Sequence, residues 1–138
     1  MAPYECIDHT ADLAIVVHAA SLKQLFEEAG RALFDLLIRT RGVRASHSII
    51  CTVEGADKED LMVNWLRELL YLFNGEEKAV SSIEILDLTP SRVEARLDWI
   101  PVDFTQDEVM TEIKAVTYHQ IRVEKTDLDY EAQVVFDV

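Results

Sequence analysis

A chain of 138 residues, 49% of them hydrophobic and with only 4 Gly and 3 Pro, has the length of one domain and a composition that excludes a disordered protein. Its 26 Asp and Glu against 13 Lys and Arg give a formal net charge of −13. This charge disfavours strong direct binding to nucleic acids and favours cations, basic ligands and basic partner surfaces. The same excess of acid can serve solubility alone, so it names no function by itself.

The sequence favours a protein that stays inside the cell. Cys6 and Cys51 lie in apolar runs typical of strands, where free thiols pack as small hydrophobic groups in a reducing cytosol. No window reaches the ~18 uninterrupted apolar residues of a membrane helix, and the polar N-terminus does not resemble a signal peptide. We therefore expect a soluble, cytoplasmic protein with a single domain over residues 1–138.

The N-terminal part predicts two strands and a helix. Residues 4–7 form a short extended run, and residues 13–19 are apolar throughout, which is typical of a strand buried on both faces. Ser21 then suits the N-cap of a helix, with Gln24 completing a capping box. The apolar i, i+3, i+4 spacing continues until the helix ends before Arg39.

A second helix follows another strand. Residues 48–54 are β-prone, Asp57 suits an N-cap, and Gly75 supplies a stop. The helix between them is apolar around most of its circumference. Three residues make its apolar face wider than one sheet would cover: Val63, Tyr71 and Leu72. We expect this helix to be central, packed against the sheet and the first helix.

The C-terminal half predicts two hairpins. Residues 82–88 and 92–100 flank one turn, residues 101–109 are irregular, and residues 116–125 and 130–138 flank a second turn. The order of elements indicates an α+β fold. We expect one mixed, mostly antiparallel sheet with two main helices packed on it, as a two-layer sandwich.

General catalytic signatures are absent: there is no Gly-rich phosphate loop, Cys-x-x-Cys, His-Glu-x-x-His or Gly-x-Ser-x-Gly. Three polar segments remain as candidates. The first is His9-Thr10-Ala11-Asp12, directly before the buried strand, which holds the Asp12 carboxylate at one end of the sheet. The alternative is an Asx-turn or a hydrogen bond to nearby backbone N–H groups.

The second segment runs from Lys114 to His119 and brings an ammonium, a hydroxyl, a phenol and an imidazole together where a strand begins. In a regular strand, alternate residues would face opposite sides. Val116, Tyr118 and Gln120 would then face one way, and Thr117, His119 and Ile121 the other. The alternative is that these polar atoms cap the edge of the sheet, with His119 as a satisfied core histidine.

The third segment is the C-terminus, where the Asp137 carboxylate adjoins the α-carboxylate of Val138. Two such groups repel each other unless a cation or hydrogen-bond donor compensates them. Hard oxygen ligands suit Ca²⁺, Mg²⁺ or Mn²⁺ and not Zn²⁺, and Asp12 would add a third anionic group. The alternative is an exposed, solvated terminus.

Four stretches in this order resemble the archease family and span nearly the whole chain. They are His9-Thr10-Ala11-Asp12, residues 61–72 with Asn64-Trp65-Leu66 and Glu68-Leu69-Leu70-Tyr71, Lys114-Ala115-Val116-Thr117-Tyr118-His119, and Val135-Phe136-Asp137-Val138. Each stretch is a weak pattern alone, and the four together are specific. Residues 41–47 and 101–109 do not match.

The resemblance implies a non-catalytic accessory protein for the RtcB-family RNA ligase, which joins tRNA halves after intron removal. It implies that the protein promotes guanylylation of the ligase and its multiple turnover. By the same likeness a divalent cation, calcium first with magnesium or manganese as alternatives, is bound by Asp12, Asp137 and the Val138 carboxylate. Lys114, His9 and His119 are candidates for partner contact or activation.

Two other functions remain open from the sequence. The chain could be a metal-dependent phosphohydrolase using Asp12, His119 and Asp137, although no phosphate cradle or clear pair of base and nucleophile supports it. It could also be a general chaperone or interaction module without site chemistry. Direct tRNA binding fits poorly with the net charge.

Overall fold

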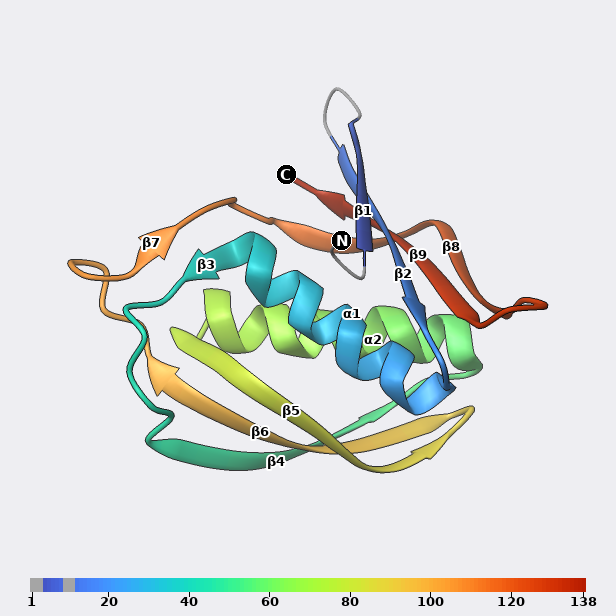
Figure 1. The fold of residues 1–138 in the computed structure, drawn as a ribbon, viewed down its shortest axis with the longest axis horizontal. Coiled ribbons are helices and arrows are strands. Elements are labelled where there is room, and N and C mark those ends of the chain that lie inside the picture. Colours follow the sequence, from blue (N-terminus) through green and yellow to red (C-terminus); the bar gives the residue numbers. More distant parts are fainter. Residues whose placement is uncertain (1–3, 9–11) are drawn as a thin grey trace.

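Two helices lie side by side between two antiparallel sheets (Figure 1). The structure is a computed structural model that describes residues 4–8 and 12–138. Helix α1 (Leu22–Leu37) and helix α2 (Lys58–Asn74) contact each other and also contact strands of both sheets. The layers are therefore sheet, helices, sheet.

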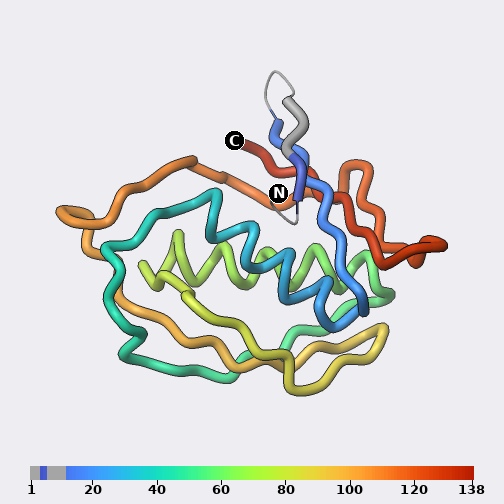
Figure 2. Tube along the Cα trace, viewed as in Figure 1, coloured from blue at the N-terminus to red at the C-terminus, as the bar shows by residue number. Residues whose placement is uncertain are grey.

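The first sheet unites the two ends of the chain. Its strands are β1 (Tyr4–Asp8), β2 (Asp12–Ala19), β9 (Tyr130–Asp137) and β8 (Ala115–Lys125), in that spatial order. All pairs are antiparallel. The traces of the N-terminal and C-terminal strands run beside each other in Figure 2.

The second sheet lies on the other side of the helices. It contains β4 (His47–Glu54), β6 (Arg92–Pro101) and β5 (Lys78–Thr89), in that order. A short ladder also joins β3 (Ile38–Arg39) to β7 (Glu108–Val109). The predicted hairpin around residues 89–92 is confirmed as β5–β6.

The predicted α+β class, the two main helices and the antiparallel pairing are confirmed. The expected single mixed sheet in two layers is wrong in its arrangement, because the strands divide into separate sheets on both sides of the helices. The physical reason lies in α2, whose apolar surface is too wide for one sheet to cover. Its buried residues are Leu61, Met62, Val63, Trp65, Leu66, Leu69, Leu70, Leu72 and Phe73.

Both predicted helix starts are confirmed by their caps. The Ser21 hydroxyl accepts a hydrogen bond from the Gln24 backbone N–H at 3.1 Å, and Asp57 Oδ1 accepts one from the Asp60 N–H at 2.8 Å. These bonds satisfy backbone donors that have no partner within the helix. At the other end of α2, the Gly75 N–H donates to the Tyr71 carbonyl at 2.7 Å.

The two loops that flank the short β3–β7 ladder are tied together by one buried carboxylate. Asp107 accepts hydrogen bonds from the Arg41 backbone N–H and guanidinium, both at 2.7 Å, and from the Asp103 N–H at 2.8 Å. The prediction of an irregular segment over residues 101–109 holds for most of its length. Its last residues form β7, which the sequence did not indicate.

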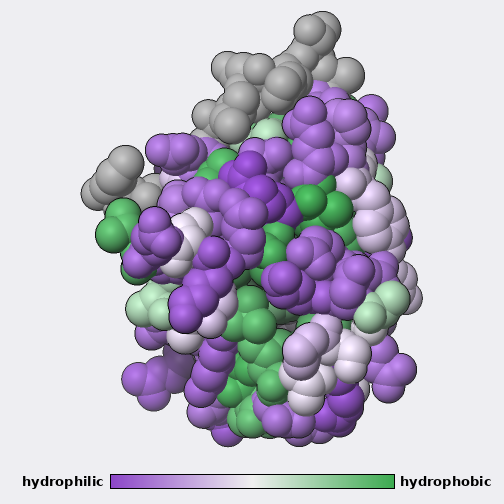
Figure 3. Space-filling view, turned by 90° about the vertical axis from the view of Figure 1, so that its right-hand side faces the viewer, coloured by the Kyte–Doolittle hydropathy of each residue, from purple (hydrophilic) through white to green (hydrophobic). Residues whose placement is uncertain are grey.

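On the face shown in Figure 3, hydrophilic residues cover most of the surface and a strip of apolar surface runs between them. Among the described helices, none is long and apolar enough to cross a membrane.

The packing of α2 against α1 predicts the effect of one substitution. Trp65 is fully buried, and its Nε1 donates a hydrogen bond to the Phe26 carbonyl at 2.9 Å. Trp65→Phe removes this bond and part of a packed ring, so we expect the free energy of unfolding to fall by about 1–3 kcal/mol. Urea denaturation measures this loss.

Trp99→Phe is the matched control, because the Trp99 Nε1 has no hydrogen-bond partner in the described structure. Each variant keeps one of the 2 tryptophans as a fluorescent probe. The control should lose less stability than Trp65→Phe. Equal losses would show that the hydrogen bond to Phe26 contributes nothing.

Candidate functional site

Asp12 and Asp137 lie directly opposite each other at the end of the β2–β9 ladder. Residues paired in this way point to the same face of a sheet, with Cβ atoms about 4.5–5.5 Å apart. Ile15 and Val134 are paired in the same ladder and belong to the core. By strand alternation, the two aspartates therefore lie on the face turned away from the helices.

A third strand brings more of the predicted site to the same place. Ala115, the first residue of β8, is paired with Asp137, and the Lys114 backbone N–H donates to the Asp137 carbonyl at 2.7 Å. Lys114 is exposed, and Val138 is 37% exposed. The ladder thus gathers residues from both ends of the chain and from the start of β8. His9, Thr10 and Ala11 lie outside the described residues.

Two carboxylates face each other at this end of the sheet. Like charges directly opposite each other in a sheet destabilise it, and no ion pair between described residues includes Asp12 or Asp137. Carboxylate oxygens suit a hard divalent cation such as Ca²⁺. The pair therefore fits such an ion in its donor chemistry.

The described side chains do not make a complete metal site. In the part of the chain that the structure describes, no three His, Cys, Asp or Glu side chains come close enough together to hold a metal ion. A cation beside Asp12 and Asp137 would thus need further oxygen ligands from backbone, water or a main-chain carboxylate. Calcium accepts such mixed oxygen ligands readily.

Strand β8 is interrupted just after this point. Thr117 pairs with Val135, but the next pair is Arg122 with Gln133, so the residues between them bulge out of the ladder. Gln120 has a φ of 52°, in the left-handed region. The predicted alternation over residues 116–121 is therefore wrong, because a bulge re-aims the side chains.

The bulge is held against α2 by Tyr118. Its hydroxyl donates to Asp60 Oδ1 at 2.5 Å, and the Arg67 guanidinium lies over its ring at 4.7 Å from the centroid. Arg67 Nε also donates to the Val116 carbonyl at 3.1 Å. Sequence reasoning missed this network. A signal was present in the spacing of Asp60 and Arg67, which lie two helical turns apart on one side of α2.

The network shifts the ionisation of both of its acids. The hydrogen bond from Tyr118, with a second from the Ala56 N–H, lowers the pKa of Asp60 below its ordinary value of 3.8. The same bond to Asp60 raises the pKa of Tyr118 above its ordinary value of 10.0. At neutral pH Asp60 is therefore ionised and Tyr118 is neutral, so the phenol can donate its hydrogen bond to the carboxylate.

His119 sits on the bulge and is exposed, so it is not the buried core histidine that one interpretation of the sequence suggested. Its backbone N–H donates to the Thr117 hydroxyl at 3.2 Å, and that hydroxyl donates to the Val135 carbonyl at 2.9 Å. Thr117 thus caps the sheet where the bulge begins. This agrees in part with the alternative that polar atoms of the segment cap the sheet edge.

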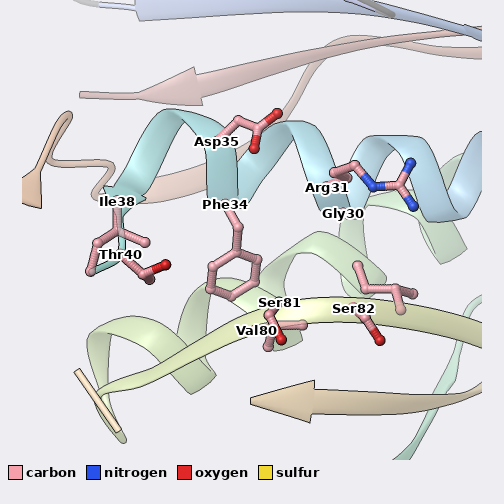
Figure 4. Close-up of a pocket in the computed structure, with 10 residues that line it drawn as sticks. Gly30, Arg31, Phe34, Asp35, Ile38, Thr40, Val80, Ser81 and Ser82 are labelled. Atoms are coloured by element: carbon pink, nitrogen blue, oxygen red, sulfur yellow. The ribbon is translucent and has the colours of Figure 1, made fainter. Parts of the chain in front are cut away.

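A separate hollow of about 220 Å³ lies between α1 and β5 (Figure 4). Phe34, Asp35 and Ser82 are among its lining residues, and burial raises the pKa of Asp35. None of the predicted site residues lines it. The hollow is therefore separate from the carboxylate pair.

The Tyr118–Asp60 bond predicts a pH-dependent effect. Tyr118→Phe removes the largest cause of the lowered Asp60 pKa, so that pKa should rise toward 3.8. A carboxyl group with a lowered pKa stabilises the fold above its unfolded pKa, and this contribution is lost as pH falls through the folded value. The variant should therefore be less stable at neutral pH and match the wild type in strong acid.

An NMR titration of the Asp60 carboxyl carbon measures the change in its pKa. Urea denaturation at neutral pH and in strong acid measures the change in stability. Tyr71→Phe is the control, because Tyr71 is exposed on the same helix and its hydroxyl has no described hydrogen bond. An unchanged Asp60 pKa in Tyr118→Phe would show that the hydrogen bond is not the cause.

The chain matches one protein family over nearly its whole length. Residues 4–138 match the model of the Archease protein family (MTH1598/TM1083). The chain is 39% identical to the protein archease of Archaeoglobus fulgidus, over 98% of each chain. It is 34% identical to that of Methanosarcina acetivorans, over 98% of this chain and 95% of the relative.

Solved structures show the same fold. The solution structure of protein 1598 of Methanobacterium thermoautotrophicum matches with a TM-score of 0.82 and 24% identity over 100% of both chains. A crystal structure from Thermotoga maritima, described as an archease and possible chaperone, matches with a TM-score of 0.66 and 25% identity. It covers 96% of this chain and 94% of the other. On its sequence and its fold, this chain belongs to the archease family.

Proposed function

We propose that this protein activates an RtcB-family RNA ligase in tRNA splicing, by promoting its guanylylation and its multiple turnover. The observation that carries the proposal is the pairing of Asp12 with Asp137, beside Lys114 and Ala115, at one end of the sheet. These residues are suited to binding charge and to contact with another protein. The chemistry of ligation belongs to the ligase.

Asp12 and Asp137 would hold a divalent cation, with calcium as the first choice and magnesium or manganese as alternatives. In a chain that ends at Val138, the terminal carboxylate would be a third anionic ligand. When bound, the cation would supply positive charge near the reacting phosphate groups of the ligase. The two aspartates orient it, and the rigid ladder fixes where it is presented.

Lys114 lies at the same end of the sheet and is a candidate for contact with the ligase. Its backbone is fixed to Asp137, and its side chain is exposed. Its exposed ammonium is free to contact the active site of the ligase or its nucleotide. His119, exposed on the β8 bulge, is a second candidate for partner contact. His9 remains a candidate from the sequence alone.

The net charge of −13 supports docking on a basic surface, since an RNA ligase must carry positive charge where it binds RNA. The proposal places this activity in the cytoplasm. Cys51 supports that placement, since it is a free thiol whose pKa burial raises to about 11. A thiol with so high a pKa is unreactive at neutral pH.

Asp12→Asn and Asp137→Asn test the proposal directly. Each removes one charge at nearly constant volume, so each should abolish stimulation of ligase guanylylation at sub-stoichiometric amounts and weaken Ca²⁺ binding in calorimetry. Without divalent cations each variant should be as stable as the wild type, or more stable by up to ~1 kcal/mol, because a repulsion is relieved. Asp127→Asn is the matched control, exposed at the far end of the β8–β9 hairpin.

Full stimulation by both variants would contradict the proposal and favour a general chaperone that does not depend on the carboxylate pair. Turnover of nucleotides or RNA ends by the pure protein would favour a phosphohydrolase. Adding one glycine after Val138 tests the third ligand, because it moves the terminal carboxylate away. Weaker Ca²⁺ binding by the extended chain is the expected result.

A further inference from the structure

A groove between the C-terminal half of α2 and the start of β8 lies beside the carboxylate pair. It has a volume of about 460 Å³. Its lining residues are Arg67, Leu70, Tyr71, Asn74, Lys114, Ala115 and Val116. Ala115 is also the residue paired with Asp137, so the groove and the carboxylates share one strand end.

The groove has the opposite charge to the rest of the molecule. The chain carries a net charge of −13, yet the lining includes two cations and no carboxylate. Of the 13 Lys and Arg residues, 8 form an ion pair with a described carboxylate. Arg67 and Lys114 are not among them. Arg67 lies near Asp60, whose pKa it helps to lower, but the groove itself is lined by two cations and no carboxylate, which favours an anionic ligand.

The guanidinium of Arg67 is held in place before any ligand binds. Its Nε donates to the Val116 carbonyl, and its plane lies over the Tyr118 ring. The Asp60 oxygens already accept hydrogen bonds from Tyr118 and Ala56, at 2.5 Å and 2.8 Å. Arg67 also lies close enough to Asp60 to help lower its pKa, after the hydrogen bonds from Tyr118 and Ala56, and it opposes the rise in the pKa of Tyr118 that the bond to Asp60 causes. A guanidinium fixed in this way carries five N–H donors in a planar array, which suits the oxygens of a phosphate.

The helix wall of the groove also carries an aromatic ring. Tyr71 is 54% exposed and its ring packs over Gly75, where an added Cβ would lie 2.6 Å from Tyr71 Cε1 and displace the ring. Leu70 is buried beside it. An exposed ring beside apolar side chains offers a stacking surface for a planar group.

We propose that this groove binds a free nucleotide, with its phosphates on Arg67 and Lys114 and its base against Tyr71. The net charge disfavours a polynucleotide, whose further phosphates would meet the acidic surface. The inference goes beyond the proposed function, since the groove lies on the helix side of the sheet and the carboxylate pair on its outer face. Arg67 and Lys114 carry their charges whether or not a divalent cation binds to Asp12 and Asp137.

Calorimetric titration with ATP, pyrophosphate and adenosine, each with and without Ca²⁺, tests the inference. Arg67→Ala should weaken binding of ATP and pyrophosphate about ten- to hundredfold, as expected for loss of a charged hydrogen bond. Tyr71→Leu should weaken ATP binding about tenfold and leave pyrophosphate binding unchanged. Arg44→Ala is the matched control, because Arg44 is exposed, outside the groove, and forms no described ion pair.

Absence of ATP binding at millimolar concentration, or equal weakening by Arg67→Ala and Arg44→Ala, would overturn the inference. So would tighter binding of an RNA oligonucleotide than of ATP. Ligase stimulation is measured separately, so the two proposals can fail independently. If the wild-type protein stimulates the ligase but binds no nucleotide, the proposed nucleotide site is wrong and the proposed function stands.

Discussion

The antiparallel ladder between β2 and β9 is the constraint on which the site depends. It runs without interruption over 8 residue pairs, from Ala19 opposite Tyr130 to Asp12 opposite Asp137. Alternate pairs, such as Ile15 with Val134, are fully buried against the helices. A shift of one residue in the register of a strand would turn its buried side chains outward and its aspartate, Asp12 or Asp137, inward. The burial that fixes the register therefore also fixes the carboxylate pair.

This dependence explains why charge repulsion is tolerated at the end of the ladder. Two aspartates directly opposite each other oppose strand pairing, but by no more than about 1 kcal/mol. The apolar pairs along the same ladder favour it by more, since full burial of one aliphatic side chain contributes about 1.5–3 kcal/mol. The fold can thus hold two negative charges together, in the way that binding sites commonly hold strained or repelling groups.

Local sequence patterns predicted most elements because they rest on local chemistry. The caps of both helices, Ser21 and Asp57, satisfy backbone donors within one turn, so they can be recognised without knowledge of the fold. The position of the second sheet could not be predicted in the same way. The wide apolar surface of α2 indicated that one sheet was too little to cover it, and the first helix, not a second sheet, was expected to cover the rest.

The candidate site was also only partly predictable from the sequence. The candidate segments around Asp12, Lys114 and Asp137 could be found in the sequence, chiefly because together they resemble one family. Their mutual register depends on pairing between opposite ends of the chain, which no local pattern encodes. The β8 bulge was missed for a related reason. It is held by Tyr118 on Asp60, a contact between distant elements.

The carboxylate pair and the cationic groove lie at the same end of the first sheet. The carboxylate pair lies at the end of the sheet, and the cationic groove lies between that sheet and α2. Both are anchored by β8, whose start pairs with Asp137 and whose bulge contacts the helix. An accessory protein of this size can therefore present charges of both signs to a partner from one rigid edge.

The most direct test of the central claim is an NMR titration with Ca²⁺, in which backbone amide shifts are followed residue by residue. The account predicts saturable shifts confined to Asp12, to residues 114–115 and to residues 137–138, and their loss in Asp137→Asn. Shifts spread over the acidic surface without saturation, or shifts that persist in Asp137→Asn, would contradict a cation site at the meeting of the two chain ends.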